Sequence, residues 1–449
     1  MALSGLQIYK LLPRTNCKEC GFPTCLAFAM KLAAKQAELA ACPYVSEEAK
    51  EQLAAAAAPP IRLITIGSDD KAISVGNETV LFRHEKTFFH QAGLFVKVRD
   101  SQPEEEYAKT ITEVADYSIE RVGIVLTFDG IAVENSSGEV QAFADCVAAV
   151  SKLTDLPLIL MSESPAALQA ALDNAGDSTP LIYGANADNY QEMAALALKH
   201  KAPLAVKVKD GDLSAMASLT KEIQQIGVKD IVLDPGTRGM ADSLATLTQL
   251  RRLAIKKNFR LLGFPITTFP GEKADSIEDE VMLAAQYIAK YAGFIVLDHF
   301  DAAIAYPLLT LRQNIFTDPQ KPIQVSPGLY EINDPTPESP LLVTTNFSLT
   351  YFSVAGEAEN SGLPTWLLIV DAEGMSVLTA WAAGKFDAEK IAKSVNTMGV
   401  LQKVGHKKIV IPGFVSTISG ELEEELPGWE ILVGPREAMD IPAYLKQWA

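Results

Sequence analysis

The chain has 449 residues, of which 48% are hydrophobic and 21% are charged, and its formal net charge is −17. This length and apolar content suffice for two or more domains with large cores, while the acidic balance argues against nucleic acid as a partner. No apolar run approaches the ~20 residues of a membrane helix and no export signal is recognisable, so we expect a cytoplasmic protein with no membrane partner.

Four cysteines lie near the start of the chain. Cys17, Cys20 and Cys25 fall within nine residues, and Cys42 follows a stretch with helical periodicity. Three thiolates in one tight loop, with a fourth returned by a helix, are typical of a four-iron four-sulfur (4Fe-4S) cluster. Zinc is the alternative, although structural zinc sites usually take their ligands as two separated pairs. Disulfides fit poorly, and the fifth cysteine, Cys146, is predicted to be a core residue of a helix.

An alanine-rich helical segment ends at Pro59-Pro60, so the predicted iron-sulfur domain covers residues 1–59. From 60 to 320, short apolar runs alternate with amphipathic helical stretches, which predicts a TIM (β/α)8 barrel, with an open doubly wound sheet as the alternative. Residues 71–98 are interpreted as a β excursion outside the barrel. The eight runs expected as barrel strands are 61–66, 123–128, 157–161, 180–183, 203–208, 230–233, 261–266 and 294–297.

Polar residues follow the predicted barrel strands, where a barrel places its ligand face. Asp also caps helices and shapes turns, and these residues form no recognisable catalytic group, so we favour a scaffold role for the barrel. The residues concerned are Asp129, Ser162, Asn186, Lys209, Asp234, Thr267, Asp298 and His299.

Prolines between Asp318 and Pro340 predict a linker over 321–337, followed by an α/β (Rossmann-like) domain over 338–449. The strands expected in this domain are 341–345, 366–371, 376–379, 408–411 and 430–433. The loops 371–376, 412–420 and 434–436 carry glycine, which permits close approach of a ligand to the backbone at the strand ends. No GxGxxG or P-loop is present, and tight turns are the alternative explanation of these loops.

Two segments resemble a known family. LLPRTNCKECGFPTC at 11–25 and EGMSVLTAW at 373–381 are similar to the large (gamma) subunit of the corrinoid iron-sulfur protein of the acetyl-CoA decarbonylase/synthase pathway, and the domain order agrees over essentially the whole chain. The resemblance implies a methyl carrier of the Wood-Ljungdahl pathway of carbon fixation in an anaerobe. It would accept a methyl group from methyltetrahydrofolate, through a methyltransferase, on a cobalamin-type corrinoid cobalt and pass it to acetyl-CoA synthase.

The resemblance also implies partners and site residues. The partners are a small subunit in a heterodimer, the methyltetrahydrofolate methyltransferase and CO dehydrogenase/acetyl-CoA synthase. Cys17, Cys20, Cys25 and Cys42 would hold a 4Fe-4S cluster that returns Co(II) to Co(I), and no catalytic side chain is implied. The corrinoid would contact Thr344, Thr345, Asn346, Ser348, Asp371, Gly374, Met375, Ser376, Val377, Leu378, Thr379, Gly413, Thr417, Ser419, Gly420, Gly434, Pro435 and Arg436.

Two other functions remain open. One is a barrel methyltransferase that binds a pterin at Asn186, Asp234 and Asp298, with the cluster as an accessory. The other is an electron-transfer subunit without a corrinoid. The C-terminal domain has a single histidine, His406, and lacks the His-x-x-Asp-x-Gly pattern of proteins in which histidine ligates cobalt, so His406 is expected to be a surface residue.

Overall fold

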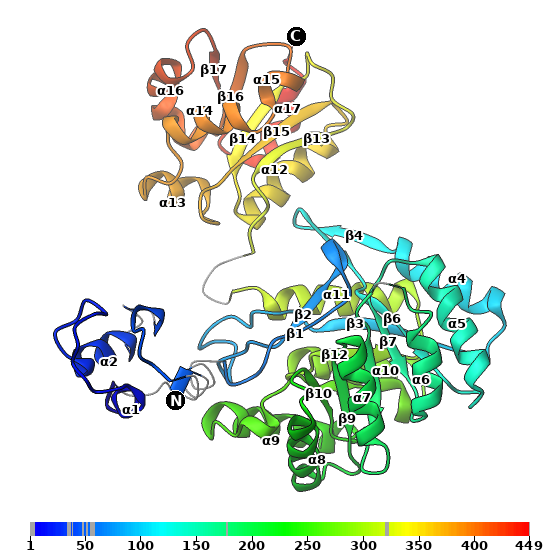
Figure 1. Ribbon diagram of the computed structural model, residues 1–449. Coiled ribbons are helices and arrows are strands. Elements are labelled where there is room, and N and C mark those ends of the chain that lie inside the picture. Colours follow the sequence, from blue (N-terminus) through cyan, green and yellow to red (C-terminus); the bar gives the residue numbers. More distant parts are fainter. Residues whose placement is uncertain are drawn as a thin grey trace. The chain divides into compact units, whose positions relative to one another are not determined.

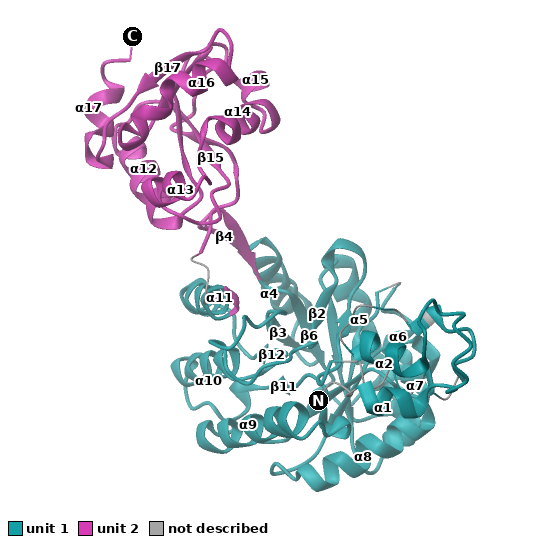
Figure 2. Ribbon diagram, turned by 90° about the vertical axis from the view of Figure 1, so that its left-hand side faces the viewer, with its two compact units in different colours: residues 1–117, 128–315 teal, residues 118–127, 316–449 magenta. Residues whose placement is uncertain are grey.

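The computed structural model describes residues 5–33, 37, 39–46, 49–50, 53, 59–176, 178–318 and 323–448. The alanine-rich segment at 54–58 lies outside the described residues. The chain divides into two compact units, Met1–Tyr117 with Phe128–Ile315 and Ser118–Thr127 with Phe316–Ala449 (Figure 2). None of the helices in the described part of the chain has the length and apolar character of a membrane span.

The first unit begins with a small helical module that contains α1 (Gly5–Leu11), α2 (Cys25–Ala33) and the 3-10 turn η1 (Leu39–Ala41). The Thr24 hydroxyl accepts a hydrogen bond from the Ala27 N–H at 3.1 Å, which satisfies a free amide of the first turn and starts α2 at Cys25. Ile8, Phe28 and Ala29 form the core of the module together with Cys25 and Cys42.

The rest of the first unit is a parallel β/α barrel (Figure 1), which confirms the predicted fold class. A parallel bridge between Leu233 and Ile266 links β10 to the segment before β11 and closes the ring. The barrel strands are β3 (Gly93–Arg99), β6 (Gly130–Glu134), β7 (Leu158–Met161), β8 (Leu181–Ala185), β9 (Leu204–Lys207), β10 (Ile231–Asp234), β11 (Thr267–Thr268) and β12 (Phe294–Leu297). The helices after them are α4 (Glu104–Asp116), α5 (Val140–Leu153), α6 (Pro165–Leu172), α7 (Tyr190–His200), α8 (Leu213–Ile226), α9 (Met240–Lys256), α10 (Ile277–Ala289) and α11 (Ala302–Phe316).

Three of the eight predicted barrel strands are wrong. The run 261–266 begins in the 3-10 turn η3 (Arg260–Leu262) and ends just before β11, the strand that occupies this place in the barrel. Residues 61–66 contain β1 (Ile64–Ile66), which pairs antiparallel with β2 (Ile73–Val75) instead of joining the ring. Ile64, Ile66 and Val75 pack with Phe95 and Phe294 in the barrel interior. The hairpin is apolar because these side chains pack inside the barrel, although its strands are not part of the ring. The first strand of the ring is instead β3, which lies almost entirely within the segment 71–98 that was predicted as a β excursion.

The predicted strand 123–128 is also wrong. It contains β5 (Ile124–Thr127), which forms an antiparallel hairpin with β4 (Ser118–Arg121), and the barrel strand is β6. This hairpin belongs to the second unit. Its turn residue Val122 is 4% exposed and packs with Val325 and Leu342 in that unit's core.

The second unit has a five-stranded sheet in the order β13-β15-β14-β16-β17. Four strands are parallel, and β13 (Gly328–Ile332) pairs antiparallel with β15 at one edge. The others are β14 (Leu341–Thr345), β15 (Thr365–Val370), β16 (Lys408–Ile411) and β17 (Glu430–Val433). The helices and 3-10 turns are α12 (Ser348–Asn360), α13 (Val377–Ala382), α14 (Ala388–Thr397), α15 (Val400–Lys403), η5 (Gly413–Ile418), α16 (Ser419–Glu425), η6 (Ala438–Asp440) and α17 (Ile441–Leu445).

The predicted linker and one predicted strand need correction. Residues 328–332 of the linker are β13, and Asn333 donates hydrogen bonds to carbonyls of α12 and its following turn. The Thr336 carbonyl also accepts from the Trp366 indole at 2.8 Å. Residues 328–336 are thus part of the folded unit, since an edge strand and its turns tolerate proline. Residues 321–322 of the predicted linker lie outside the described residues. Residues 376–379, predicted as a strand, begin α13 instead.

Candidate functional site

The four N-terminal cysteines lie in one module. Cys25 and Cys42 are buried in its core, Cys20 packs against that core, and Cys17 is exposed. The backbone N–H of Asn16 donates to Cys25 Sγ at 3.4 Å. The chemistry of this set, four thiols and an amide directed at sulfur, fits an iron-sulfur cluster.

Among the described residues, no three His, Cys, Asp or Glu side chains converge closely enough to hold a single metal ion. A structural zinc binds all four of its ligands to one ion, whereas a 4Fe-4S cluster binds each thiolate to a different iron.

The second candidate site lies in the sheet of the second unit. The chain runs from β14 to β15 on one side and then returns to β16 on the other side of β14, so the strand order reverses between β14 and β16. These two strands share a single paired position, Leu342 with Val410. Open parallel sheets bind ligands at the carboxyl ends of the strands beside such a reversal.

A cavity of about 390 Å³ occurs at this point. The ends of β14 and β16 form one side, and α12 and the loops after β15 and β17 complete it. The Thr344 and Thr345 hydroxyls are buried and, within the described part of the chain, have no hydrogen-bond partner. Buried polar groups are normally paired, so this edge of the sheet fits a ligand with polar groups of its own.

Several of the sequence-predicted corrinoid residues line this cavity. They are Thr344, Ser376, Val377, Leu378, Gly434, Pro435 and Arg436. Gly413 is beside it, where a Cβ would lie 2.6 Å from the Gly434 carbonyl oxygen and 3.0 Å from the Arg436 nitrogen. Glycine at 413 therefore lets the two loops approach each other.

Three other residues that were predicted to contact the corrinoid determine the conformation of the loop after β15. The Asn346 side chain accepts hydrogen bonds from the Ala372 and Gly374 amides at 2.9 and 3.0 Å and donates to Asp371 Oδ1 at 3.1 Å. Gly374 has φ +71°, and a Cβ there would lie 2.7 Å from the Gln324 side chain. Asn346, Asp371 and Gly374 thus shape the loop and do not line the cavity.

The remaining predicted residues lie outside the lining. Thr345 is buried, and the Thr379 hydroxyl is 3.0 Å from that of Ser376. Met375 packs against the core, Ser348 starts α12, Thr417 is in η5, and Ser419 and Gly420 start α16.

Sequence reasoning missed the residues that line the cavity from α12 and from the turn before α17. They are Leu349, Thr350, Ser353 and Val354 on α12, Glu437 and Ala438 before α17, and Ile441 at its start. Phe414 also lines the cavity and lies in the predicted loop 412–420. The signal that could have found them is the strand order, because a reversal at β14 makes the helix after that strand one wall of the crevice.

His406 lies before β16, at the amino end of that strand and away from the cavity. Its Nδ1 accepts from the Lys408 N–H at 3.1 Å, and its Nε2 is 2.8 Å from the Ser339 carbonyl oxygen. Both ring nitrogens are engaged, so His406 is not positioned to ligate a metal at the cavity.

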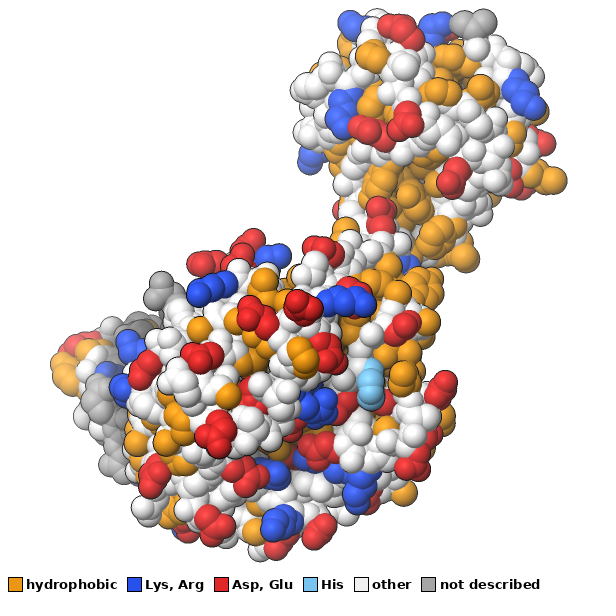
Figure 3. Space-filling model, turned by 90° about the vertical axis from the view of Figure 1, so that its right-hand side faces the viewer, with side chains coloured by type: hydrophobic (Ala, Val, Ile, Leu, Met, Phe, Trp, Pro, Cys, Tyr) orange, Lys and Arg blue, Asp and Glu red, His pale blue; other side chains and the backbone are white. Residues whose placement is uncertain are grey.

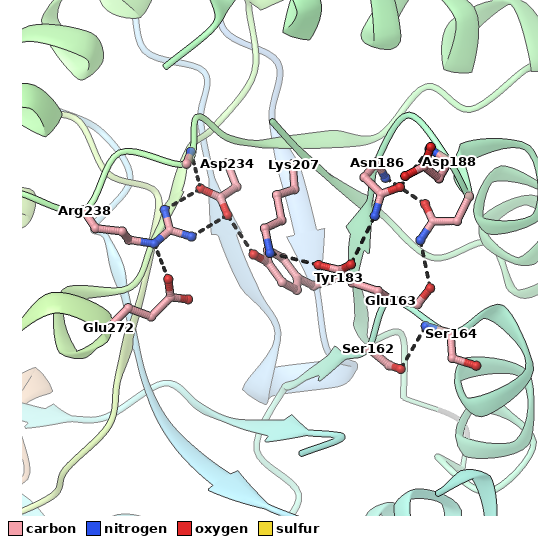
Figure 4. A network of polar contacts seen from close by, with 12 residues as sticks. Ser162, Glu163, Ser164, Tyr183, Asn186, Asp188, Lys207, Asp234, Arg238 and Glu272 are labelled. Carbon is pink, nitrogen blue, oxygen red and sulfur yellow. Dashed lines mark hydrogen bonds and ion pairs between the residues drawn. The ribbon is translucent and has the colours of Figure 1, made fainter. Parts of the chain in front are cut away.

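A polar network fills part of the carboxyl end of the barrel (Figure 4). Asp234, fully buried, accepts two hydrogen bonds from Arg238 at 2.8 Å each and one from the Tyr183 hydroxyl at 2.7 Å. Burial and then the negative charge of Asp234 raise the pKa of Tyr183 well above its usual value, so the phenol keeps its proton. In the same view, Lys207 pairs with Glu163 at 2.9 Å.

A second network lies on neighbouring strands. Lys97, 5% exposed, places Nζ 2.9 Å from Asp298 Oδ1, and Arg99 lies 2.5 Å from Asp298 Oδ2. Asp129 is not on this face, because its carboxylate bonds the Leu94 N–H near the start of β3 and pairs with Arg312. The predicted barrel residues Asp234 and Asp298 are therefore engaged in ion pairs, which supports the scaffold role.

Arg238→Met is expected to lower the free energy of unfolding of the barrel by about 3–5 kcal/mol, because it leaves the buried Asp234 carboxylate without its cation. Thermal or urea unfolding of the purified protein measures the change. Lys109→Met is the matched control: it breaks the exposed pair with Glu113 and should cost less than about 1 kcal/mol. Equal costs for the two variants would contradict a structural role for Arg238.

Lys and Arg side chains are interspersed with Asp and Glu on the face drawn in Figure 3, without a broad basic patch on that face. In the second unit, exposed apolar side chains include Leu349, Leu378 and Phe414, all of which line the cavity. The edge of the cavity thus offers apolar surface.

Comparison with known proteins gives the following similarities. A family described as the CO dehydrogenase/acetyl-CoA synthase delta subunit matches residues 63–445, and one for an Fe-S cluster matches residues 12–44. The corrinoid/iron-sulfur protein large subunit of Moorella thermoacetica is 46% identical over 446 residues, 99% of each chain. The acetyl-CoA decarbonylase/synthase complex subunit gamma of Methanothermobacter thermautotrophicus is 37% identical over 100% of each chain.

Among solved structures, 7,8-dihydropteroate synthase from Vibrio fischeri aligns with 56% of this chain and 97% of its own, at a TM-score of 0.37 and 12% identity. A similarity of that size supports no functional conclusion.

Proposed function

Because the chain belongs to the family of the corrinoid/iron-sulfur protein large subunit, or gamma subunit, of the acetyl-CoA synthase system, we propose that it is a methyl carrier that binds a corrinoid and a 4Fe-4S cluster. It would take a methyl group from methyltetrahydrofolate, through a methyltransferase, and deliver it to acetyl-CoA synthase. The corrinoid supplies the cobalt that accepts and releases the methyl group, and the cluster supplies the electron that restores cobalt after oxidation.

The observation that carries the proposal is the cavity between β14 and β16. Its apolar lining would contact the cofactor, and residues 376–378 at the start of α13 and the loop 434–436 would orient it through backbone and side-chain contacts. The free hydroxyl of Thr344, which lines the cavity, would serve a polar group of the cofactor. Since His406 is engaged elsewhere, this unit would leave cobalt without a histidine ligand, which favours its reduced state.

In the first unit, Cys17, Cys20, Cys25 and Cys42 would hold the cluster. The second unit would present the cofactor to its partners, which we propose to be a small subunit, the methyltransferase and CO dehydrogenase/acetyl-CoA synthase. We propose further that the second unit moves as one body. The chain passes between the two units at 117/118, 127/128 and 315/316, so such motion would involve three segments and not one tether.

Metal analysis of the full-length chain purified with its small subunit tests the proposal. We expect about one cobalt per four iron atoms, with the corrinoid and iron-sulfur absorptions both present. Iron without cobalt would replace the proposal with an electron-transfer subunit. Tight binding of a pterin to the isolated chain, lost on substitution of Asn186, would instead favour a barrel methyltransferase.

A further inference from the structure

Asn16, in the loop before Cys17, forms hydrogen bonds with Cys25, which lies nine residues further along the chain. It does so through both its backbone and its side chain. The Asn16 N–H donates to Cys25 Sγ at 3.4 Å, and Asn16 Oδ1 accepts from the Cys25 N–H at 2.8 Å. Asn16 thus fixes both the backbone and the sulfur of Cys25. This reciprocal pair holds the cysteine loop against the first turn of α2.

The orientation of the Asn16 N–H depends on an uncommon backbone conformation. Asn16 has φ +50°, and Arg14, Lys18 and Gly21 have φ values of +60°, +70° and +81°. Left-handed residues alternating with others turn successive amides toward one side and make a concave surface that favours negative charge. Asn adopts this conformation more readily than most residues, whereas β-branched residues rarely do.

We propose that Asn16 is a positioning residue that raises the reduction potential of the cluster through its N–H to the Cys25 thiolate. The inference rests on the proposed 4Fe-4S cluster and on Cys25 as one of its ligands. Reduction adds one electron to a centre that already carries the charge of its thiolates. A hydrogen bond to a ligand sulfur withdraws negative charge and therefore stabilises the reduced form more than the oxidised form.

Asn16→Val tests the N–H, because valine disfavours the left-handed conformation and moves the amide away from sulfur. We expect reduction to become about tenfold less favourable, a fall of about 59 mV for a one-electron couple. Asn16→Gly keeps the conformation and the N–H while losing the side chain, so it should keep the wild-type potential. Asn258→Val is the matched control, because Asn258 is exposed, has φ +50° and lies in the barrel.

The measurement is a redox titration of the purified full-length complex, followed by the electron paramagnetic resonance signal of the reduced cluster, with iron content measured on the same samples. Asn16→Val with full iron and the wild-type potential would overturn the inference. If Asn16→Val loses iron, the reduction potential of Asn16→Asp provides the test. It keeps the shape and the acceptor for the Cys25 N–H, and its added negative charge should lower the potential if Asn16 faces the cluster.

An unchanged potential in iron-replete Asn16→Asp would also overturn the inference. A wild-type protein without iron or without a cluster signal would instead refute the proposed cluster itself. The two failures are therefore distinguishable.

Discussion

The Cys20→Ser variant is expected to fold and to lack the broad visible absorption of an iron-sulfur cluster. Cys20 packs against the core of the helical module, and the barrel core is built from other residues, so removal of one thiolate should release the cluster without unfolding the barrel. Iron analysis and the visible spectrum measure the loss. Methyl transfer from protein reduced beforehand should persist, since the proposed function requires the cluster only after cobalt is oxidised.

Cys146→Ala is the matched control for the loss of one sulfur. Cys146 lies on the buried face of α5, and burial raises its thiol pKa to about 12, so it is not a thiolate near neutral pH. This variant should keep full iron and the full spectrum. If Cys20→Ser retained wild-type iron, Cys20 would not be a ligand, and the assignment of the four cysteines would need revision.

Ser353→Trp is expected to lower the corrinoid content of the purified protein at least tenfold. Ser353 lies on α12, is exposed, and lines the cavity beside β14, so an indole there would occupy space that the proposed cofactor needs. A loss of about 1.4 kcal/mol of binding free energy already lowers affinity tenfold. Cobalt analysis and corrinoid absorption measure the effect, with the melting temperature as a check of folding.

Ser353→Ala is the control that shows whether a loss of cobalt in Ser353→Trp results from the filled space or from the lost hydroxyl. The Ser353 hydroxyl donates to the Leu349 carbonyl within its own helix, at 2.9 Å, so alanine keeps the cavity open and should keep wild-type cobalt. Iron content should be unchanged in both variants, because the four cysteines lie in the first unit. Equal cobalt in wild type and a folded Ser353→Trp would place the corrinoid elsewhere.

Residue 374 is a poorer place for the same test. Gly374 has a left-handed backbone, and a side chain there would meet Gln324, so a substitution would distort the loop before it touched any ligand. A variant in the cavity wall avoids this problem.

Short-range features were readable from the sequence. The spacing of Cys17, Cys20 and Cys25 is a property of neighbouring residues and needs no knowledge of the fold. The apolar runs that became β7, β9, β10 and β12 were recognisable because buried parallel strands are continuously hydrophobic. The family resemblance likewise rested on two short segments, and the comparisons with known proteins confirmed it over the whole chain.

Pairing between segments that are distant in the sequence determined the features that the sequence analysis placed wrongly. Ile64 and Ile66 are as apolar as residues of a barrel strand, but they fill the barrel as part of a hairpin, and periodicity cannot tell these two kinds of burial apart. Asp129 lies before its strand and not after it, which moves it to the opposite end of the barrel.

The cavity depended on tertiary structure most of all. Its position follows from the order of β15, β14 and β16, which is set by pairing between residues 25 positions apart (Leu341 with Trp366) and 68 positions apart (Leu342 with Val410) and is absent from local sequence. That order brings Ser353 and Phe414 beside the predicted loop residues Ser376 and Arg436. Sequence alone therefore predicted the four cysteines as cluster ligands and the approximate loops, and only the folded sheet decided which side chains enclose a common space.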